Sequence, residues 1–334
     1  MKKKSEINIL FLAKYAPKNI AEAIPENIYD KVYAQYHHKV YEVLTNNYGK
    51  IVSTTDPGGI LHLNTEVDYI FSLYNKFPIR NSEIFISSVS EYLKIPYLGA
   101  SPNIRALAED KHLAKLLSKH EGVPTAQWKT YNVDQAIIPP EFAPPYFVKP
   151  RFGAASAEID ESSICASWEL AAKKINELYK KDIDVILEEQ IKGIYYTCPV
   201  LNNFGAPLFL TPIKETSTLK DNVVTHQQKR KIQGGLSREI SSDTTINQIL
   251  LGFSKKLFKQ IQPLDYTRFD FIVDEDTGIP SLLEFNVCCN LGERSTIAQS
   301  SLASSISYED LLINIVDSSM SRQKLISSSE CHQL

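Results

Sequence analysis

The sequence predicts an α/β protein whose N-terminal part is a small open parallel sheet and whose later parts are built on antiparallel sheets. Up to about residue 110, short apolar runs alternate with helix-like stretches, as they do in a parallel sheet. From Tyr146 onward, short strands and glycine turns dominate. The turn Asn202–Gly205 lies between two of these strands and is suited to an antiparallel hairpin, which supports the change of sheet type.

In the N-terminal part, the expected strands are Ile7–Ala13, Ile51–Thr54 and Val67–Leu73, and the expected helices between them are Tyr29–Leu44 and Ser82–Leu93. Ser101 followed by Pro102 is a typical helix start, because serine caps the helix and proline fits its first turn. The leucine spacing from Leu113 to Leu117 predicts that this helix continues to Gly122.

The later elements follow from the same patterns. The expected strands are Tyr146–Pro150, Val185–Glu189, Ile194–Leu201, Leu208–Ile213, Thr267–Val273 and Leu282–Val287, and the expected helices begin at Ser167, Ile246 and Ser307. Residues 319–334 are rich in serine, and we expect them to be a disordered tail.

Composition and charge exclude several classes of protein. Of the 334 residues, 43% are hydrophobic and 22% charged, which is typical of an ordinary folded protein. With 36 basic and 39 acidic side chains the net charge is -3, so we expect neither nucleic acid nor a membrane as a partner. No apolar run approaches the roughly 20 residues that a membrane-spanning helix needs. Five cysteines, an odd number, favour a reducing cytoplasm.

The strongest chemical signal lies in the last two strands. Because side chains alternate along a strand, Arg268 and Asp270 share one face of the first strand, and Glu284 and Asn286 share one face of the second. A hairpin brings all four onto one surface. Two carboxylates and an amide suit one or two Mg²⁺ ions completed by water and phosphate oxygens, with Arg268 near developing negative charge. The alternative is a solvated polar face on an ordinary amphipathic hairpin.

Two further segments suggest nucleotide chemistry. Lys149, in a strand, is followed by a loop of small residues, 153–156, whose backbone N–H groups can approach phosphates. The strand Val185–Glu189 ends in carboxylates and leads to exposed backbone, which can bind the amino group and the ring edge of a purine. Taken singly, each signal is weak, because an acidic strand end usually faces water.

Together, in this order and at these spacings, the segments resemble the ATP-grasp ligases, and most closely the D-alanine–D-alanine ligase-like branch. Further matching stretches are Tyr92–Gly99, Glu109–Lys111, Gly122–Pro124 and Ser307–Leu312. The resemblance covers about residues 5–318. It implies an N-terminal α/β domain over residues 1–110, a central ATP-grasp domain with the phosphate loop over 111–198, and a C-terminal ATP-grasp domain with the Mg²⁺ hairpin over 199–318. The two ATP-grasp domains would be α+β in character.

The resemblance also implies roles for individual residues. ATP would be bound by Lys111 and Lys149 at its phosphates, by Gly153 and Ser156 in the closing loop, by Glu188 and Ile191 at the adenine, and by either Lys229 or Lys231. Two Mg²⁺ ions, or Mn²⁺ in their place, would be held by Asp270, Glu284 and Asn286. The catalytic set would be Lys149, which neutralises phosphate charge, Arg268, which stabilises the intermediate, and Ser295, which binds the carboxylate of the amine-bearing substrate.

Several departures from the family pattern concern the substrates. Tyr195 stands where a ribose-binding glutamate is common, which puts that contact in doubt. The elements that help to bind the first D-alanine are missing after the first strand and are replaced in the stretch 74–83, where Arg80 is either an anion anchor or an exposed structural arginine. Cys288, Cys289 and Asn290 replace the usual small residue, proline and glycine, and so alter the floor of the second-substrate site.

We therefore expect an ATP-dependent carboxylate–amine ligase that forms an amide or peptide bond between small molecules through an acyl phosphate, with an amino acid as the amine donor, in specialised metabolite biosynthesis. A divergent D-alanine–D-alanine ligase of cell-wall synthesis is the first alternative, and a non-catalytic nucleotide-binding regulator is the second. The expected cofactors are ATP and Mg²⁺. The expected partners are the carboxylate and amine substrates and a second copy of the chain in a homodimer, and the expected location is the cytoplasm.

Overall fold

The computed structural model describes residues 1–24, 26, 28–63, 66–74, 77, 79, 82–153, 158–218, 235–332 and 334. Its first sheet is parallel, as the sequence predicts, with the order β2-β1-β3, in which β1 spans Asn8–Leu12, β2 Lys50–Thr54 and β3 Tyr69–Ser72. Phe11 on one face packs with α1 (Ile28–Asn47), and Leu10 on the other face packs with α2 (Ile84–Leu93). Both faces are covered, as is usual for a parallel sheet.

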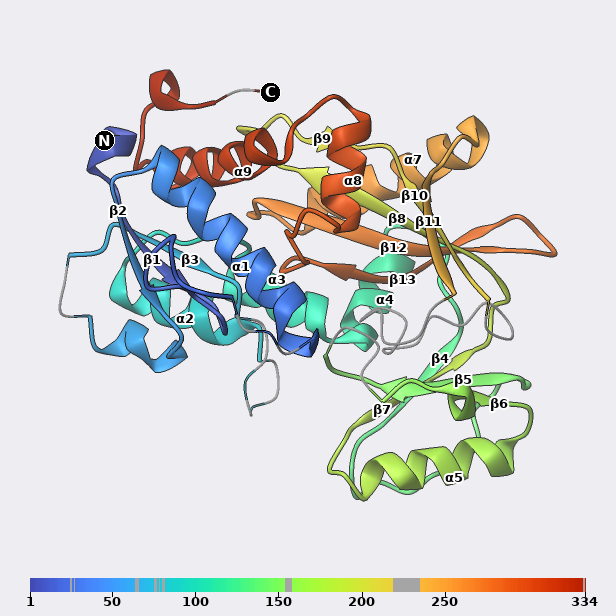
Figure 1. The fold of residues 1–334 in the computed structure, drawn as a ribbon. Helices are drawn as coiled ribbons and strands as arrows, with labels where there is room; N and C mark the ends of the chain where they lie inside the picture. The colour runs from blue at the N-terminus through green and yellow to red at the C-terminus, as the bar shows by residue number, and fades with distance from the viewer. Residues whose placement is uncertain are drawn as a thin grey trace.

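A four-stranded antiparallel sheet forms the central part of the chain. Its order is β4-β7-β5-β6, and its strands are Trp128–Tyr131 (β4), Tyr146–Pro150 (β5), Ile164–Cys165 (β6) and Val185–Glu189 (β7). Helix α5 (Trp168–Tyr179), capped by Ser167, packs against this sheet in a hydrophobic core of its own. Figure 1 shows this green unit set apart from the rest of the molecule.

The third sheet is antiparallel and carries the predicted metal hairpin. Its order is β11-β10-β8-β12-β13, with β9 also paired to β8. The strands are Gly193–Leu201 (β8), Leu208–Phe209 (β9), Ile213–Ser217 (β10), Leu236–Ile240 (β11), Tyr266–Asp274 (β12) and Pro280–Asn286 (β13). The expected strand Leu208–Ile213 is thus split between β9 and the start of β10. Strand β8 lies wholly in this sheet, so the change of sheet falls before Gly193 and not at the expected residue 198.

Helix α7 (Thr244–Gln260) packs on this sheet, with Leu250 and Leu257 in the same core as Phe269. The single helix expected from Ser101 to Gly122 is in fact two, α3 (Pro102–Glu109) and α4 (Lys111–His120). They are separated by Asp110, whose backbone is extended and whose carboxylate caps α4. Asp110 therefore ends α3 because its backbone and carboxylate begin α4.

The C-terminal residues are ordered where they are described, so the expectation of a disordered tail from 319 is wrong for that part. Helix α8 spans Thr296–Ala303, and α9 runs from Tyr308 to Arg322. Beyond α9, Ile326 is 1% exposed and forms a parallel bridge with Lys2, which places the start of the chain beside the segment that follows α9 (Figure 1). The serines do not prevent folding, because buried hydroxyls such as Ser319 accept hydrogen bonds.

No helix within the described ranges is both long and apolar enough to cross a membrane.

Candidate active site

The β12–β13 hairpin brings the predicted polar residues together on one surface. Its strands pair with Arg268 opposite Asn286 and Asp270 opposite Glu284. Phe269, between the two polar residues of β12, is fully buried in the core on the other face. The ladder shifts register directly after Asp270, a local irregularity of the kind that redirects side chains at functional sites.

Asp270 lies at the centre of this set. Its Oδ1 accepts a hydrogen bond from Thr197 Oγ1 at 2.9 Å, and its Oδ2 accepts one from Asn286 Nδ2 at 3.1 Å. Arg268 Nε lies 3.3 Å from the same Oδ2. Burial works against the charged guanidinium, but Asp270 and other acidic neighbours outweigh it and raise the pKa of Arg268. Arg268 therefore carries a fixed positive charge in the site.

The oxygen ligands on the hairpin fit Mg²⁺, although not as a closed protein cage. Within the described part of the chain, no cluster of three or more His, Cys, Asp or Glu side chains could hold a metal ion by itself. The hairpin offers the carboxylates of Asp270 and Glu284 together with the amide of Asn286. Mg²⁺ commonly takes one or two carboxylates, keeps several waters and binds substrate phosphates, so this set matches its usual coordination.

The central sheet contributes a buried carboxylate between two ammonium groups. Glu188 on β7 is 2% exposed, and its Oε2 lies 3.0 Å from the Nζ of Lys149 on β5. Its Oε1 lies 3.3 Å from the Nζ of Lys115 on α4. Burial disfavours the ionised carboxylate, but Lys115 and Lys149 outweigh it and lower the pKa of Glu188. The structure thus brings together Lys149 and Glu188, which the sequence predicted, and adds Lys115, which it did not.

Lys111 connects the hairpin to the predicted phosphate loop. It is the first residue of α4, its Nζ donates a hydrogen bond to the carbonyl of Gly153, and the same Nζ lies 4.0 Å from Glu284 Oε2. Gly153 has a φ of 90°, which favours glycine at the start of this loop. Arg151 donates two hydrogen bonds, of 2.9 and 2.7 Å, to the Asp110 carboxylate and so holds the end of β5 against the start of α4.

The other predicted site residues lie at the edges of this region. Ile191 is half-buried in the connection between β7 and β8. Tyr195 pairs with Glu215 in the third sheet. Burial raises the pKa of Tyr195 to about 12, and the charges of Glu188 and Glu215 add to the rise. Ser295 is buried and caps α8, where its Oγ accepts a hydrogen bond from the backbone N–H of Ala298 at 3.2 Å. Ser156, Lys229, Lys231 and Arg80 lie outside the described residues.

A second buried cluster, which the sequence did not reveal, lies where the chain leaves the hairpin. Arg105 on α3 is 3% exposed and donates hydrogen bonds to Cys288 Sγ at 2.6 Å, to the Leu98 carbonyl at 2.7 Å and to the Ala100 carbonyl at 2.9 Å. A side chain at Gly99 would place its Cβ 2.3 Å from Arg105 Nη2. Arg105 thus fixes Cys288, one of the residues that departs from the family pattern, against the N-terminal domain.

Glu83 belongs to the same cluster and gives a stability prediction. Burial, opposed in part by Arg105, raises the pKa of Glu83 to about 7 from its usual value of 4.5. The folded state therefore holds a proton that the unfolded state releases between these values, so folding is weakened as pH rises from about 4.5 to 7. We expect Glu83→Gln to remove this loss, about 3 kcal/mol between pH 5 and pH 8. Urea unfolding of both proteins at the two pH values measures it, and an identical pH dependence would contradict it.

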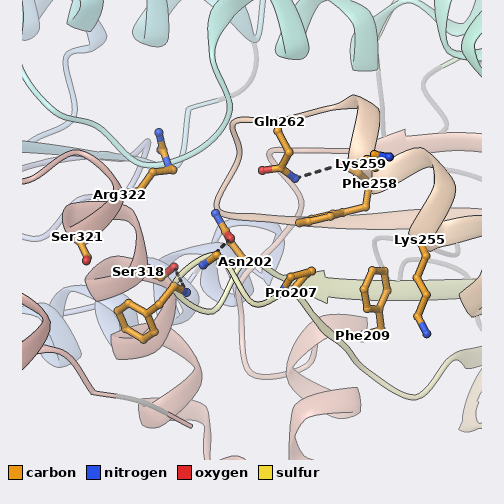
Figure 2. Close-up of a pocket in the computed structure, with 12 residues that line it drawn as sticks. Asn202, Pro207, Phe209, Lys255, Phe258, Lys259, Gln262, Ser318, Ser321 and Arg322 are labelled. Carbon is orange, nitrogen blue, oxygen red and sulfur yellow. Dashed lines mark hydrogen bonds between the residues drawn. The ribbon is translucent and has the colours of Figure 1, made fainter.

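A pocket of about 600 Å³ lies apart from these residues. Figure 2 shows its lining from the turn after β8, from α7 and from the end of α9, including Asn202, Phe209, Lys255, Phe258, Lys259 and Arg322. None of the predicted site residues that the structure describes lines it. The candidate active site is therefore identified by the side chains that the hairpin, α4 and the central sheet bring together.

Comparison with known proteins shows the family of this chain. A family model described as "D-ala D-ala ligase C-terminus" matches residues 117–317. Because that match spans more than half of the chain, the chain belongs to the D-alanine–D-alanine ligase family. The family has the ATP-grasp fold, and its members are ATP-dependent ligases that form carbon–nitrogen bonds, which confirms the class of enzyme predicted from the sequence.

The individual relatives are distant in sequence, but their alignments cover most of this chain. The D-alanine–D-alanine ligase of Clostridium beijerinckii is 27% identical over 268 residues, which cover 78% of this chain and 84% of the relative. D-alanine–D-alanine ligase B of Clostridium perfringens is also 27% identical, over 263 residues that cover 76% of this chain and 81% of the relative.

The solved structures agree in fold. The D-alanine–D-alanine ligase of Bacillus anthracis, solved in complex with ATP, has a TM-score of 0.73 at 18% identity and covers 95% of this chain and 98% of its own. The corresponding ligase of Coxiella burnetii has a TM-score of 0.69 at 16% identity and covers 96% of this chain and 95% of its own. This likeness confirms the predicted fold class, a parallel N-terminal sheet followed by two antiparallel sheets.

Proposed function

We propose that this enzyme binds ATP between the central sheet and the β12–β13 hairpin and uses it to join a carboxylate to an amine. The observation that carries the proposal is the position of Lys111, which touches Gly153 at the start of the phosphate loop and approaches Glu284 on the metal hairpin. Phosphates held there would lie between the loop and the carboxylates. The Bacillus anthracis ligase, which has the same fold, was solved in complex with ATP, and this supports ATP as the nucleotide.

The reaction would proceed in two steps. A carboxylate oxygen of the first substrate attacks the γ-phosphorus of ATP, and the bond from that phosphorus to the β,γ-bridging oxygen breaks. ADP is the leaving group, and the first substrate becomes an acyl phosphate. The uncharged amine of the second substrate then attacks the acyl carbon. The tetrahedral adduct expels phosphate, and the nitrogen loses a proton to give the amide. Most of the catalysis would come from positioning and charge neutralisation.

The chain supplies side chains for each step of this reaction. Lys149 would turn from Glu188 to the phosphates and neutralise their charge, and Arg268 would face the oxygen on which negative charge develops. Asp270, Glu284 and Asn286 would hold Mg²⁺, which when bound neutralises phosphate oxygens. The start of α8 at Ser295 would receive the carboxylate of the amine-bearing substrate, because a helix N-terminus favours an anion.

For the substrates, the relatives favour D-alanine as both carboxylate and amine, since both curated relatives described above are named D-alanine–D-alanine ligases. A divergent D-alanine–D-alanine ligase was the first alternative that the sequence left open, and the relatives support it better than a ligase of specialised metabolite biosynthesis.

A second candidate is a ligase that acts on a carboxylate or an amine other than D-alanine. The contact between Arg105 and Cys288 favours it, because Cys288 follows directly on the hairpin, where the family pattern places a different residue. The absence from the sequence of the elements that help to bind the first D-alanine points the same way.

The experiment that tests the proposal is phosphate release from ATP and Mg²⁺ in the presence of D-alanine, and separately with pools of D-amino acids, L-amino acids and other carboxylate and amine metabolites. Products are identified by mass spectrometry, and Glu284→Gln is the control that should lose product formation. D-alanyl-D-alanine as the sole product would establish the first candidate, and another condensed product the second. Nucleotide binding without turnover in every pool would favour a regulator.

The homodimer and the cytoplasmic location stay predictions.

A further inference from the structure

Lys115 is a fully buried lysine that the proposed chemistry does not use. It lies on α4 with 0% exposure, and Nζ donates a hydrogen bond to Thr125 Oγ1 at 2.8 Å. Nζ also lies over the ring of Trp128, 5.8 Å from its centroid. Because burying a lysine costs free energy unless its charge is paired, such a residue needs a partner. That partner is Glu188, whose Oε1 lies 3.3 Å away.

Glu188 is shared between Lys115 and Lys149 in the structure, one ammonium at each carboxylate oxygen. The proposed function needs Lys149 at the phosphates, which would take away the ion pair at Oε2. If Lys115 were absent, Glu188 would then have neither lysine beside it, and a buried carboxylate without a cation takes up a proton or moves. Lys115 remains beside Oε1, and the departure of Lys149 would free Oε2 to accept a hydrogen bond from a ligand donor.

Lys115 is itself fixed to the metal hairpin. Thr125, which accepts the hydrogen bond from Lys115, donates one to the Leu282 carbonyl at 2.7 Å. Leu282 lies on β13 two residues before Glu284. A chain of contacts therefore runs from the hairpin through Thr125 and Lys115 to Glu188, and it does not pass through Lys149.

We propose that Lys115 is a positioning residue that keeps Glu188 ionised and in place for the amino group of adenine when Lys149 turns to the phosphates. This inference rests on the proposed function, because it concerns the nucleotide that the ligase uses. Lys115 touches neither the phosphates nor the reacting atoms. Its effect is exerted through Glu188 on the recognition of the base.

The test compares two nucleotides that differ only in the adenine amino group, ADP and purine riboside 5′-diphosphate, each with Mg²⁺. Their dissociation constants are measured by calorimetry, and the ratio of the two is the readout. A hydrogen bond to a charged acceptor should make ADP bind on the order of 10-fold more tightly to the natural enzyme. In Lys115→Met we expect that preference to fall close to equal binding, because the acceptor is lost, while Lys115→Arg restores part of it.

Lys119→Met is the matched control, since Lys119 is an exposed lysine of the same helix, and it should keep the natural preference. A preference for ADP that is unchanged in Lys115→Met would overturn the role of Lys115 and leave the proposed function intact. Equal binding of both nucleotides to the natural enzyme would overturn the role of Glu188 and Lys115 together. No nucleotide binding at all would reject the proposed function. If Lys115→Met does not fold, the same ratio in Lys115→Gln decides.

Discussion

Replacing Arg268 with alanine should lower kcat on the order of 10² to 10³-fold, as for the loss of other preorganised groups that stabilise a developing oxyanion. Arg268 is fixed by Asp270, and its acidic neighbours keep it charged, so it needs no rearrangement when charge develops. The KM for ATP should change far less, because the proposed contact forms in the transition state. Steady-state kinetics with the substrates that the ligase assay identifies measure both constants.

Arg268→Lys is the graded control for this prediction. Lysine keeps the positive charge but loses the planar fork of the guanidinium, so it should recover part of the lost rate. Thermal unfolding of both variants checks that the hairpin still folds, since removing Arg268 takes an ion pair away from Asp270. A loss of less than 10-fold in a folded Arg268→Ala would contradict the catalytic role.

Asp270→Asn should raise the Mg²⁺ concentration needed for half-maximal rate by on the order of 10 to 100-fold. Changes to residues that only hold metal ligands in place typically weaken metal binding by this much. The substitution keeps the shape of the side chain and removes its charge. The hydrogen bond from Thr197 to Oδ1 can persist, so the position of the side chain should be retained. The rate is measured against Mg²⁺ concentration at saturating ATP, and Mn²⁺ is titrated in parallel.

Asp276→Asn provides the matched comparison for the metal prediction. Asp276 lies in the exposed turn of the same hairpin, so the charge change is identical but remote from the proposed ligands. We expect its Mg²⁺ dependence to equal that of the natural enzyme. If Asp270→Asn shows the same Mg²⁺ dependence as Asp276→Asn, Asp270 is not a ligand.

The hairpin could be predicted from the sequence because its information is local. Side chains alternate along a strand, so the spacing from Arg268 to Asp270 and from Glu284 to Asn286 places them on one surface once the two strands pair. Strands β5 and β7 were predicted with the observed boundaries for the same reason. The break at Asp110 escaped prediction, because the helix-start signal at Ser101 is followed by a nearly continuous helical pattern.

Lys115 could not be predicted, because the apolar pattern of α4 suggests the wrong buried face. The leucine spacing points to Leu113 and Leu116, yet these are 37% and 45% exposed, while Lys111 and Lys115 are buried. The buried face is set by what it packs against, namely Glu188 and the hairpin, and not by its own hydrophobicity. Long-range contacts of this kind, like that of Arg105 with Cys288, are not encoded in local spacing.

The attachment of the central sheet to the hairpin has a mechanical consequence. The chain enters that sheet after Pro124 and leaves it before Lys192, and both points are hydrogen-bonded to the same hairpin, Pro124 to the N–H of Leu282 at 2.7 Å and Lys192 to the N–H of Glu275 at 3.0 Å. The segment that carries Lys149 and Glu188 is thus attached to the hairpin at both of its ends, and the Arg151–Asp110 and Lys115–Glu188 ion pairs attach it to α4 as well. Any movement of this sheet away from the hairpin would have to break these two ion pairs. The pairing of Asp270 with Glu284 lies within the hairpin, so such a movement would leave it unchanged.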